Sequence, residues 1–285
     1  MRQSMGKWYL PAIAGVAVVL VGLLAILAVD RGMRAAALEE TRSVAESDLA
    51  ILAAGLESEL EKFSLVPRVL AVDPQVRALL AGADQQQAVL NRRLADLADQ
   101  TGASAIYLMD SRGTTLAASN WSLPSSFVGS NYGFRSYFSE AMANGASSEF
   151  ALGTVSRRPG LYIAQRVEAG ASRLGVVALK VEFDAIERSW RGIDEGVFVT
   201  DADGVVLITS DPDWRFQMTR PTTSDARDPI QDELRFGTPS LQTLNLPTGG
   251  PSPSSAHLIE KIQPIAAQGW ELHLLVDPQP GLAAA

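Results

Sequence analysis

Leu108–Ser119 reads LMDSRGTTLAAS, and Val199–Ser210 reads VTDADGVVLITS. In each segment an apolar run enters an Asp-x-x-Gly turn and a second apolar run leaves it, which predicts a β-hairpin. Aligned, the two segments share the aspartate, the glycine, a leucine and the closing serine. One such hairpin is common, but two copies about 90 residues apart indicate a duplicated unit. We therefore expect two small antiparallel sheets.

Helical and strand patterns extend in both directions from these hairpins. Upstream, apolar periodicity predicts a long helix over 30–65, a short helix between Asp73-Pro74 and Gly82, and another over 85–100 with Val89 facing inward. Between the hairpins we expect helices near 134–143 and 184–191, and strands near 150–155, 161–166 and 175–181. Strands at 256–262 and 270–276 follow a polar, proline-rich stretch. The predicted fold class is α+β.

The first apolar run extends from Trp8 to Val29 without a charged residue. At about 1.5 Å per residue it reaches roughly 30 Å, the thickness of a hydrocarbon core. A cleaved secretory signal is the alternative, but signal cores are shorter, about 7–15 residues. Arg2 and Lys7 favour a cytoplasmic N-terminus, although Arg31 and Arg34 beyond the run weaken that argument. We expect a cytoplasmic N-terminus and a transmembrane helix within 1–29, with the rest of the chain outside.

The long helix has one apolar stripe, at Leu49, Leu52, Leu56, Leu60 and Phe63. The spacing of three and four residues fits a helix packed on its own domain and also fits the seam of a homodimer. The predicted organisation is a helical region over 30–101, a membrane-distal unit over 102–192, a membrane-proximal unit over 193–277 and a connector over 278–285.

The charge balance excludes some partners. The formal net charge is −8, and setting aside the two positive charges of Arg2 and Lys7 leaves −10 on everything beyond them. A surface this acidic argues against nucleic acid or anionic lipid as the partner. His257 and His273 lie in apolar, strand-like stretches and are expected to be structural. No metal or nucleophile motif is present, so we expect no cofactor in this chain.

Five residues form a candidate ligand site. Arg135 and Tyr137 lie where a loop enters a helix, and can present a planar cation and a hydroxyl to a carboxylate. Thr154 and Ser156 are two residues apart, so on a strand their hydroxyls share a face. Lys180 has apolar neighbours on both sides within Val176–Val181 and would be costly to bury without a partner. Two cations and three hydroxyls suit a small dianion.

Each of these signals has a simpler interpretation. Arg135 fits a surface arginine beside an aromatic core anchor. Thr154 and Ser156 fit a solvated sheet face, and Lys180 fits an edge-strand lysine that reaches solvent.

The segments that carry these residues resemble a known family. SNWSLPSSFVGSNYGFRSYFSEAMANG from Ser119, FALGTVSRRPGLYIAQRV from Phe150 and GVVALKVEF from Gly175 resemble the periplasmic sensor region of C4-dicarboxylate sensor histidine kinases of the DctB type. The similarity runs from about residue 104 to Arg215. Ser136 stands where the family pattern leads us to expect proline, which affects the loop geometry more than the charge.

The resemblance implies two tandem PAS-like (double Cache) units on a long dimerising helix in the bacterial inner membrane. The distal unit is expected to bind succinate, fumarate or malate through Arg135, Tyr137, Thr154, Ser156 and Lys180. The family's kinase half, which uses ATP and acts on a response regulator, is not among these residues, so we expect no phosphorylation by them alone. One alternative is a chemoreceptor of the same fold for a ligand such as an amino acid, with Glu182 as a possible ammonium partner. A membrane-anchored enzyme or assembly protein is a second.

Overall fold

The computed structural model describes residues 9–193, 195–220, 235–237, 242–244, 246, 258–266 and 268–278, with the backbone alone described for 9–19. Within these ranges a single long helix accompanies two antiparallel sheets, in agreement with the predicted α+β class. Predicted elements that fall on other residues, including His257 and the connector over 278–285 beyond Pro278, lie largely outside the described part. The boundaries of the two units stay a prediction.

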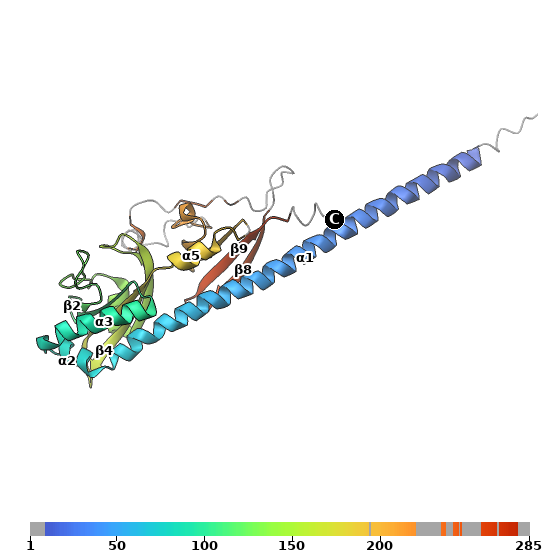
Figure 1. Ribbon diagram of the computed structural model, residues 1–285. Coiled ribbons are helices and arrows are strands. Elements are labelled where there is room, and N and C mark those ends of the chain that lie inside the picture. Colours follow the sequence, from blue (N-terminus) through green and yellow to red (C-terminus); the bar gives the residue numbers. More distant parts are fainter. Residues whose placement is uncertain are drawn as a thin grey trace, which may run out of the picture.

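Helix α1 (Tyr9–Ala71) is longer than the sequence pattern predicts. It lies along both sheets and projects far beyond them at its N-terminal end (Figure 1). Among the side chains that the structure describes, no helix is both long enough and apolar enough to cross a membrane. The span predicted over 8–29 falls partly outside those side chains and stays a prediction.

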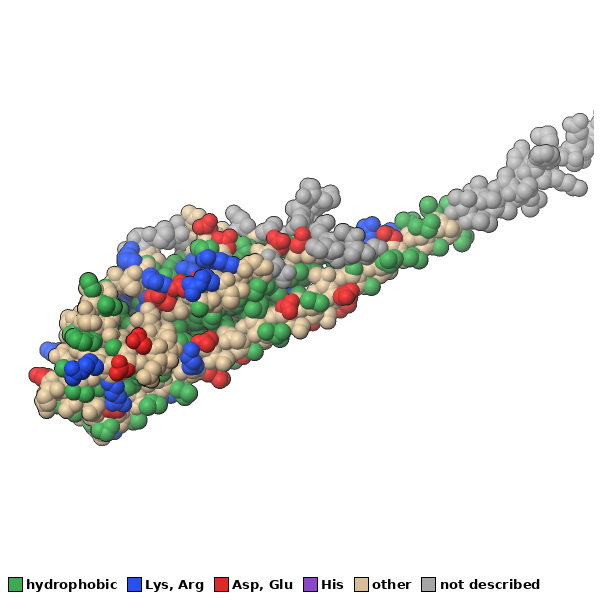
Figure 2. Space-filling model, in the orientation of Figure 1, with side chains coloured by type: hydrophobic (Ala, Val, Ile, Leu, Met, Phe, Trp, Pro, Cys, Tyr) green, Lys and Arg blue, Asp and Glu red, His purple; other side chains and the backbone are tan. Residues whose placement is uncertain are grey.

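The apolar stripe of α1 packs on the chain's own core. Leu49, Leu56, Leu60 and Phe63 are buried there, and Leu52 is partly buried against them. A second apolar stripe, which the sequence pattern did not single out, remains exposed: Val44, Ile51, Leu65, Val69 and Val72. Apolar side chains also recur along the visible side of α1 (Figure 2).

Two short helices follow α1. Helix α2 (Pro74–Leu80) begins as predicted, because Asp73 caps it through the backbone N–H groups of Gln75 and Val76. Helix α3 (Gln87–Thr101) ends at Gly102, which has a left-handed backbone. Val89, predicted to face inward, is instead exposed, because Leu90 and Leu94 occupy the buried face of this helix.

The first sheet has the strand order β2-β1-β5-β4-β3. Its strands are antiparallel neighbours: β1 (Ala105–Asp110), β2 (Thr115–Ala118), β3 (Ala146–Leu152), β4 (Pro159–Ala169) and β5 (Ser172–Val181). One face packs on α1, α2 and α3. The other is covered by helix α4 (Ser136–Asn144) and the loop that precedes it. Side chains on this second face are therefore enclosed in a separate small core.

The second sheet has the order β7-β6-β9-β8 and also packs on α1. It comprises β6 (Gly196–Thr200), β7 (Val206–Thr209), β8 (Ile259–Ile265) and β9 (Trp270–Val276). Helix α5 (Asp184–Trp190) connects the two sheets, and the 3-10 turn η2 (Pro212–Trp214) follows β7.

The repeated hairpin sequence has the same hydrogen bonds in both sheets. The Asp110 carboxylate accepts the backbone N–H groups of Arg112 and Thr114, and Asp201 accepts those of Asp203 and Val205. Gly113 and Gly204 both have left-handed φ values, of 85° and 82°. The closing serines also correspond.

Ser119 accepts the backbone N–H of Ile106, and Ser210 accepts that of Val197, each at 3.0 Å. Each serine thus ties the end of its hairpin to the start of the same hairpin's first strand. Because three of the four shared residues have matching structural roles, the repeated sequence reflects repeated hairpin geometry.

Candidate functional site

The predicted site residues gather on the face of the first sheet that α4 covers. In the strand register Lys180 lies opposite Tyr162, and Tyr107 lies opposite Ala178. Directly opposed residues of an antiparallel pair point to the same side, so Tyr107, Tyr162 and Lys180 share this face. Arg135 is the N-cap residue of α4, and Tyr137 lies in its first turn. The start of α4 therefore meets the centre of the sheet.

Three tyrosines form the wall of the site. The rings of Tyr137 and Tyr162 are stacked, with 4.9 Å between centroids and 2° between planes. The Tyr107 hydroxyl donates a hydrogen bond to the Tyr137 hydroxyl at 2.8 Å. Burial raises the pKa of all three phenols, so they stay protonated in neutral solution and act as neutral hydrogen-bonding groups.

Tyr132 adds a further hydroxyl. Its oxygen is buried and has no hydrogen bond of good geometry within the described part of the chain, although Ser130 and Thr154 lie close enough to lower its pKa. Burial raises the pKa of Tyr132, while Ser130, the Arg135 charge and Thr154 oppose that rise. A buried hydroxyl without a partner costs free energy. A ligand that accepted a hydrogen bond from it would remove that cost.

Arg135 is buried, with 3% of its surface exposed, so the interpretation as a surface arginine is wrong. Its Nη2 donates to the Leu152 carbonyl at 2.8 Å, and its guanidinium lies 5.4 Å from the Phe134 ring centroid. Leu152 is the last residue of β3, immediately before the loop that carries Thr154. The arginine is thus held between the start of α4 and this loop.

Thr154 and Ser156 lie on a tight turn between β3 and β4, and the prediction that they share a strand face is wrong. The strand ends because Gly153 and Arg158 close a loop, with hydrogen bonds from Gly153 N to Arg158 O and from Arg157 N to Gly153 O. Arg157 has a left-handed φ of 52°. A Cβ at position 153 would lie 2.3 Å from Ser156 Oγ and 3.0 Å from the Tyr162 hydroxyl. Glycine therefore lets this loop pack closely on the site.

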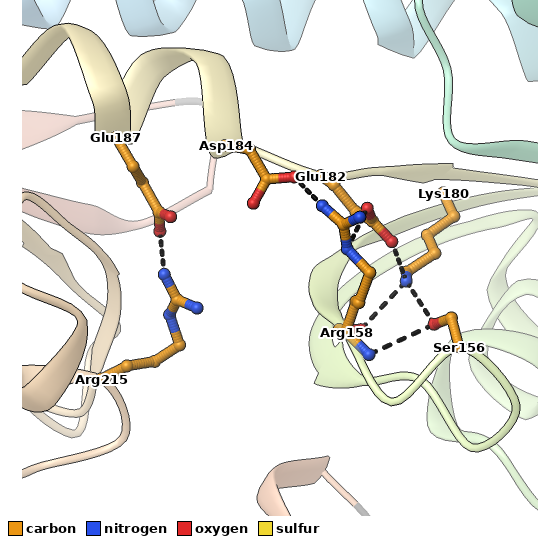
Figure 3. Close-up of polar contacts among 7 residues, drawn as sticks. All are labelled: Ser156, Arg158, Lys180, Glu182, Asp184, Glu187 and Arg215. Carbon is orange, nitrogen blue, oxygen red and sulfur yellow. Dashed lines mark hydrogen bonds and ion pairs between the residues drawn. The ribbon is translucent and has the colours of Figure 1, made fainter.

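Lys180 is completely buried, so the interpretation as a solvent-reaching edge lysine is wrong. Its strand, β5, lies in the middle of the sheet. Its Nζ donates to Ser156 Oγ at 2.8 Å, to the Arg158 carbonyl at 3.0 Å and to Glu182 Oε1 at 2.5 Å (Figure 3). Burial lowers the pKa of Lys180, and the adjacent Glu182 carboxylate opposes that shift.

A chain of charges leads outward from Lys180 (Figure 3). Glu182 Oε2 accepts from Arg158 Nε at 2.8 Å, and Arg158 also pairs with Asp184 at the start of α5. One turn further along α5, Glu187 pairs with Arg215 at 2.5 Å and accepts the backbone N–H of Thr209 at 3.4 Å. Helix α5 therefore has polar contacts with both sheets.

The structure connects the five predicted residues through a small number of neighbours. Ser156 and Lys180 are in direct contact, and Lys180 lies 5.8 Å from the Tyr162 ring centroid, on which Tyr137 stacks. Thr154 and Arg135 both lie near the Tyr132 hydroxyl and lower its pKa. Tyr107, Tyr132, Tyr162 and Arg158 were not predicted. Position on a shared sheet face would have identified Tyr162, but that required the register between β4 and β5.

His273 lies in the second sheet with partners on both nitrogens. Its ring stacks on Phe198 at 4.5 Å, with Thr200 Oγ1 3.1 Å from Nε2 and Glu260 Oε1 2.8 Å from Nδ1. His273 and Thr200 are both buried, which supports the structural role predicted for the histidine. Within the described residues, no cluster of acidic or histidine side chains could hold a metal ion.

The sequence and the fold both match known sensors. The C4-dicarboxylate transport sensor protein DctB of Rhizobium meliloti (strain 1021) is 38% identical over 285 residues, a match that covers 95% of this chain and 46% of that protein. The crystal structure of the V. cholerae histidine kinase DctB sensor domain gives a TM-score of 0.73 at 26% identity, over 84% of this chain and 98% of that domain. This chain is a DctB-type homologue.

The predicted resemblance to DctB-type sensors is therefore confirmed. The chain spans 46% of the length of the Rhizobium relative, so the activity of a whole DctB-type protein is a matter for proposal. The ligand-binding domain of the Pseudomonas fluorescens chemoreceptor CtaA in complex with L-leucine has a TM-score of 0.60 at 17% identity, over 85% of this chain and 97% of that domain. This second likeness shows a shared fold alone. No family model matches the chain.

Proposed function

We propose that this chain is the periplasmic sensor region of a two-component sensor histidine kinase and that it binds a C4-dicarboxylate such as succinate, fumarate or malate. The observation that carries the proposal is the pair of buried cations, Arg135 and Lys180, behind one helix in a chain of net charge −8. Guanidinium and ammonium groups both bind carboxylates strongly where little water competes, and Lys180 already holds the Glu182 carboxylate. Two such cations suit a ligand with a carboxylate at each end.

The surrounding groups match the remaining needs of such a ligand. Carboxylate oxygens accept several hydrogen bonds each, and the hydroxyls of Tyr132, Tyr137, Thr154 and Ser156 are the neutral donors around the two cations. The stacked rings of Tyr137 and Tyr162 provide an apolar surface for a short carbon chain. The Rhizobium meliloti relative is named a C4-dicarboxylate transport sensor.

We extend the proposal to the membrane anchor, the two units and the dimer. Residues 8–29 anchor the chain in the inner membrane, and the two sheets form tandem PAS-like (double Cache) units in the periplasm. The exposed stripe of α1 supports a homodimer, because Val44, Ile51 and Leu65 are separated by multiples of seven residues. A kinase half, using ATP and acting on a response regulator, would belong to a longer parent protein.

An amino-acid ligand is the alternative that a specific observation favours. Glu182 is 2.5 Å from Lys180, and Glu149 lies near enough to the stacked tyrosines to affect the pKa of Tyr162. Either carboxylate could pair with the ammonium of an amino acid.

The test is isothermal titration of succinate into the purified chain, with aspartate and glutarate as comparisons. Saturable binding of succinate that Arg135→Ala weakens by about 1–3 kcal/mol supports the dicarboxylate proposal and its site together. Binding of aspartate in preference to succinate supports the amino-acid alternative. Absence of heat with every diacid, in a chain with a cooperative thermal transition, contradicts the proposed ligand class.

A further inference from the structure

Lys180 has no spare hydrogen-bonding capacity. An ammonium group has three N–H donors, and those of Lys180 are directed to Ser156 Oγ, the Arg158 carbonyl and Glu182 Oε1. A ligand carboxylate can therefore bind Lys180 only if it displaces one of these acceptors. The carbonyl of Arg158 is backbone within a closed loop, so the choice is between the hydroxyl and the carboxylate.

Charge favours displacement of Glu182. If the ligand replaced Ser156, two carboxylates would share one buried cation, and their repulsion is strong where little solvent screens it. Glu182 also has a second cation available, since its Oε2 already accepts from Arg158 Nε at 2.8 Å. The exposed fractions of the side chains rise along this path, from 0% for Lys180 to 13% for Glu182 and 54% for Arg158. A shift of Glu182 toward Arg158 is thus a shift toward water.

We propose that Glu182 is a displaceable internal counterion of Lys180, which a ligand carboxylate must outcompete and which thereby sets affinity and selects for anionic ligands. This inference rests on the proposed function, because it assumes that a carboxylate binds Lys180. Without ligand, Glu182 keeps the buried lysine charged and paired. With ligand, the Glu182 carboxylate leaves Lys180 and pairs with Arg158 alone. A neutral ligand gains little at Lys180, because the lysine is already neutralised.

The same step changes the surroundings of α5. Arg158 is shared between Glu182 and Asp184, the first residue of α5. Once the Glu182 carboxylate has left Lys180, its only cation partner among the described residues is Arg158. It then binds Arg158 more strongly and competes with Asp184 for that guanidinium. Ligand binding therefore weakens the Arg158–Asp184 ion pair at the start of α5, the helix that connects the two sheets.

The test compares Glu182→Gln with the wild-type chain in titrations of succinate. The glutamine keeps the size of the side chain and an acceptor oxygen but removes the competing charge. We expect succinate to bind Glu182→Gln about tenfold more tightly, the effect of one charged hydrogen bond that no longer has to be broken. Glu168→Gln is the matched control, because it removes a carboxylate charge that pairs with Arg166 on the same sheet and touches neither Lys180 nor Arg158, and its affinity should stay within about twofold of wild type.

A second measurement separates this mechanism from a general change in the site. Without Glu182 the buried lysine holds its proton less strongly, so succinate binding at pH 8.5 should take up more protons in Glu182→Gln than in wild type. Titration in two buffers of different ionisation enthalpy measures this uptake. If Glu182→Gln binds succinate more tightly but takes up no additional protons, the increase in affinity does not arise at Lys180, and the inference is overturned.

The outcomes also separate this inference from the proposed function. Succinate binding that is equal or weaker in a folded Glu182→Gln overturns the counterion role while leaving the dicarboxylate site in place. If neither wild type nor Glu182→Gln binds any diacid, both proposals are wrong. If Glu182→Gln does not fold, Glu182→Asp is tested in its place. Its carboxylate lies one methylene further from Lys180, so it should compete less with succinate and tighten succinate binding by a smaller factor. Unchanged or weaker succinate binding in Glu182→Asp would overturn the counterion role.

Discussion

Lys180 shows how a residue can serve binding at the expense of stability. Burial lowers the pKa of its ammonium, so the folded state disfavours the charged form. The resulting penalty is present at neutral pH and is relieved as pH rises through the lowered pKa toward the unfolded value of 10.5. A buried ion pair can be replaced by apolar groups at little cost.

We therefore expect Lys180→Met to abolish succinate binding and leave the free energy of unfolding within about 1 kcal/mol of wild type. Glu182 keeps Arg158 as a partner in this variant, so no carboxylate is left unpaired. Titration and thermal unfolding of the same samples check both halves. A large loss of stability would mean that Lys180 is primarily a structural residue.

Arg135 is expected to behave differently, because it holds the backbone as well as the proposed ligand. Arg135→Ala should weaken succinate binding by about 1–3 kcal/mol by leaving one carboxylate unpaired. It should also destabilise the chain modestly, since the Leu152 carbonyl loses its donor. Arg166→Ala is a useful comparison: its guanidinium also donates to backbone carbonyls, Met142 and Ala143, and was not assigned to the site. Equal affinity losses in both variants would contradict a direct role for Arg135.

At the level of single residues, the sequence identified the charges but not their partners. Arg135 and Lys180 could be predicted because a cation among apolar residues is unusual. Tyr107 and Tyr162 could not, because an aromatic residue in a strand is ordinary until the register places it beside Lys180. Glu182 was considered as a partner for a ligand's ammonium, and its contact with Lys180, two residues earlier, was not predicted.

At the level of elements, the hairpins and caps were predictable because their signals are local. The Asp-x-x-Gly turns and the Asp73-Pro74 helix start involve hydrogen bonds within a few residues. The position of Thr154 and Ser156 was wrong because the strand was extended through Gly153. The turn depends on the left-handed backbone of Arg157, a residue type that gives no sequence signal for that conformation.

The α2 cap gives a prediction with a defined pH dependence. Partial burial raises the pKa of Asp73, but the hydrogen bonds from Arg93 and from the backbone N–H groups of Gln75 and Val76 outweigh it and hold the pKa below 3.8. A carboxyl with a lowered folded pKa stabilises above its unfolded pKa and loses that effect as pH falls through the folded value. Asp73→Ala should therefore cost about 1 kcal/mol at neutral pH. The difference in Tm from wild type should shrink below pH 3.8, and a pH-independent difference would contradict this account.

The exposed stripe of α1 predicts which substitutions disrupt the proposed dimer. Ile51 is 68% exposed and lies opposite the buried residues Leu49 and Ala53 on the helix. Ile51→Glu should shift the chain toward monomer in sedimentation experiments without lowering its Tm in the monomeric state, because this side chain has no role in the core. Ala50→Glu, also exposed but off the stripe, is the matched control. Identical sedimentation of the two variants would indicate that this face is not the dimer seam.

At the scale of the whole molecule, the arrangement along α1 offers a route by which the proposed site on the first sheet could affect the second sheet. Both sheets pack on the same rod-like helix, and α5 joins them as a second, shorter connection (Figure 1). A ligand shifts an equilibrium only if it binds two arrangements with different affinity. The two ion pairs of α5 are suited to such a difference, because Asp184 pairs with Arg158, next to the first sheet, and Glu187 pairs with Arg215, which follows β7 of the second sheet.

Glu187→Gln should therefore separate binding from transmission. Among the described residues, Glu187 makes its polar contacts with Arg215 and the backbone of Thr209 and not with the proposed ligand contacts, so succinate affinity should stay within about twofold of wild type. Succinate should slow amide hydrogen exchange in the wild-type segment from Gly196 to Thr209, because Glu187 ties α5 to Arg215 and to the backbone of Thr209. In Glu187→Gln that protection should be weaker, while protection around Arg135 is retained. Glu59→Gln, which removes an exposed ion pair with Lys62 on α1, controls for loss of a surface charge. Full protection of the second sheet in Glu187→Gln would mean that coupling runs through α1 and not through α5.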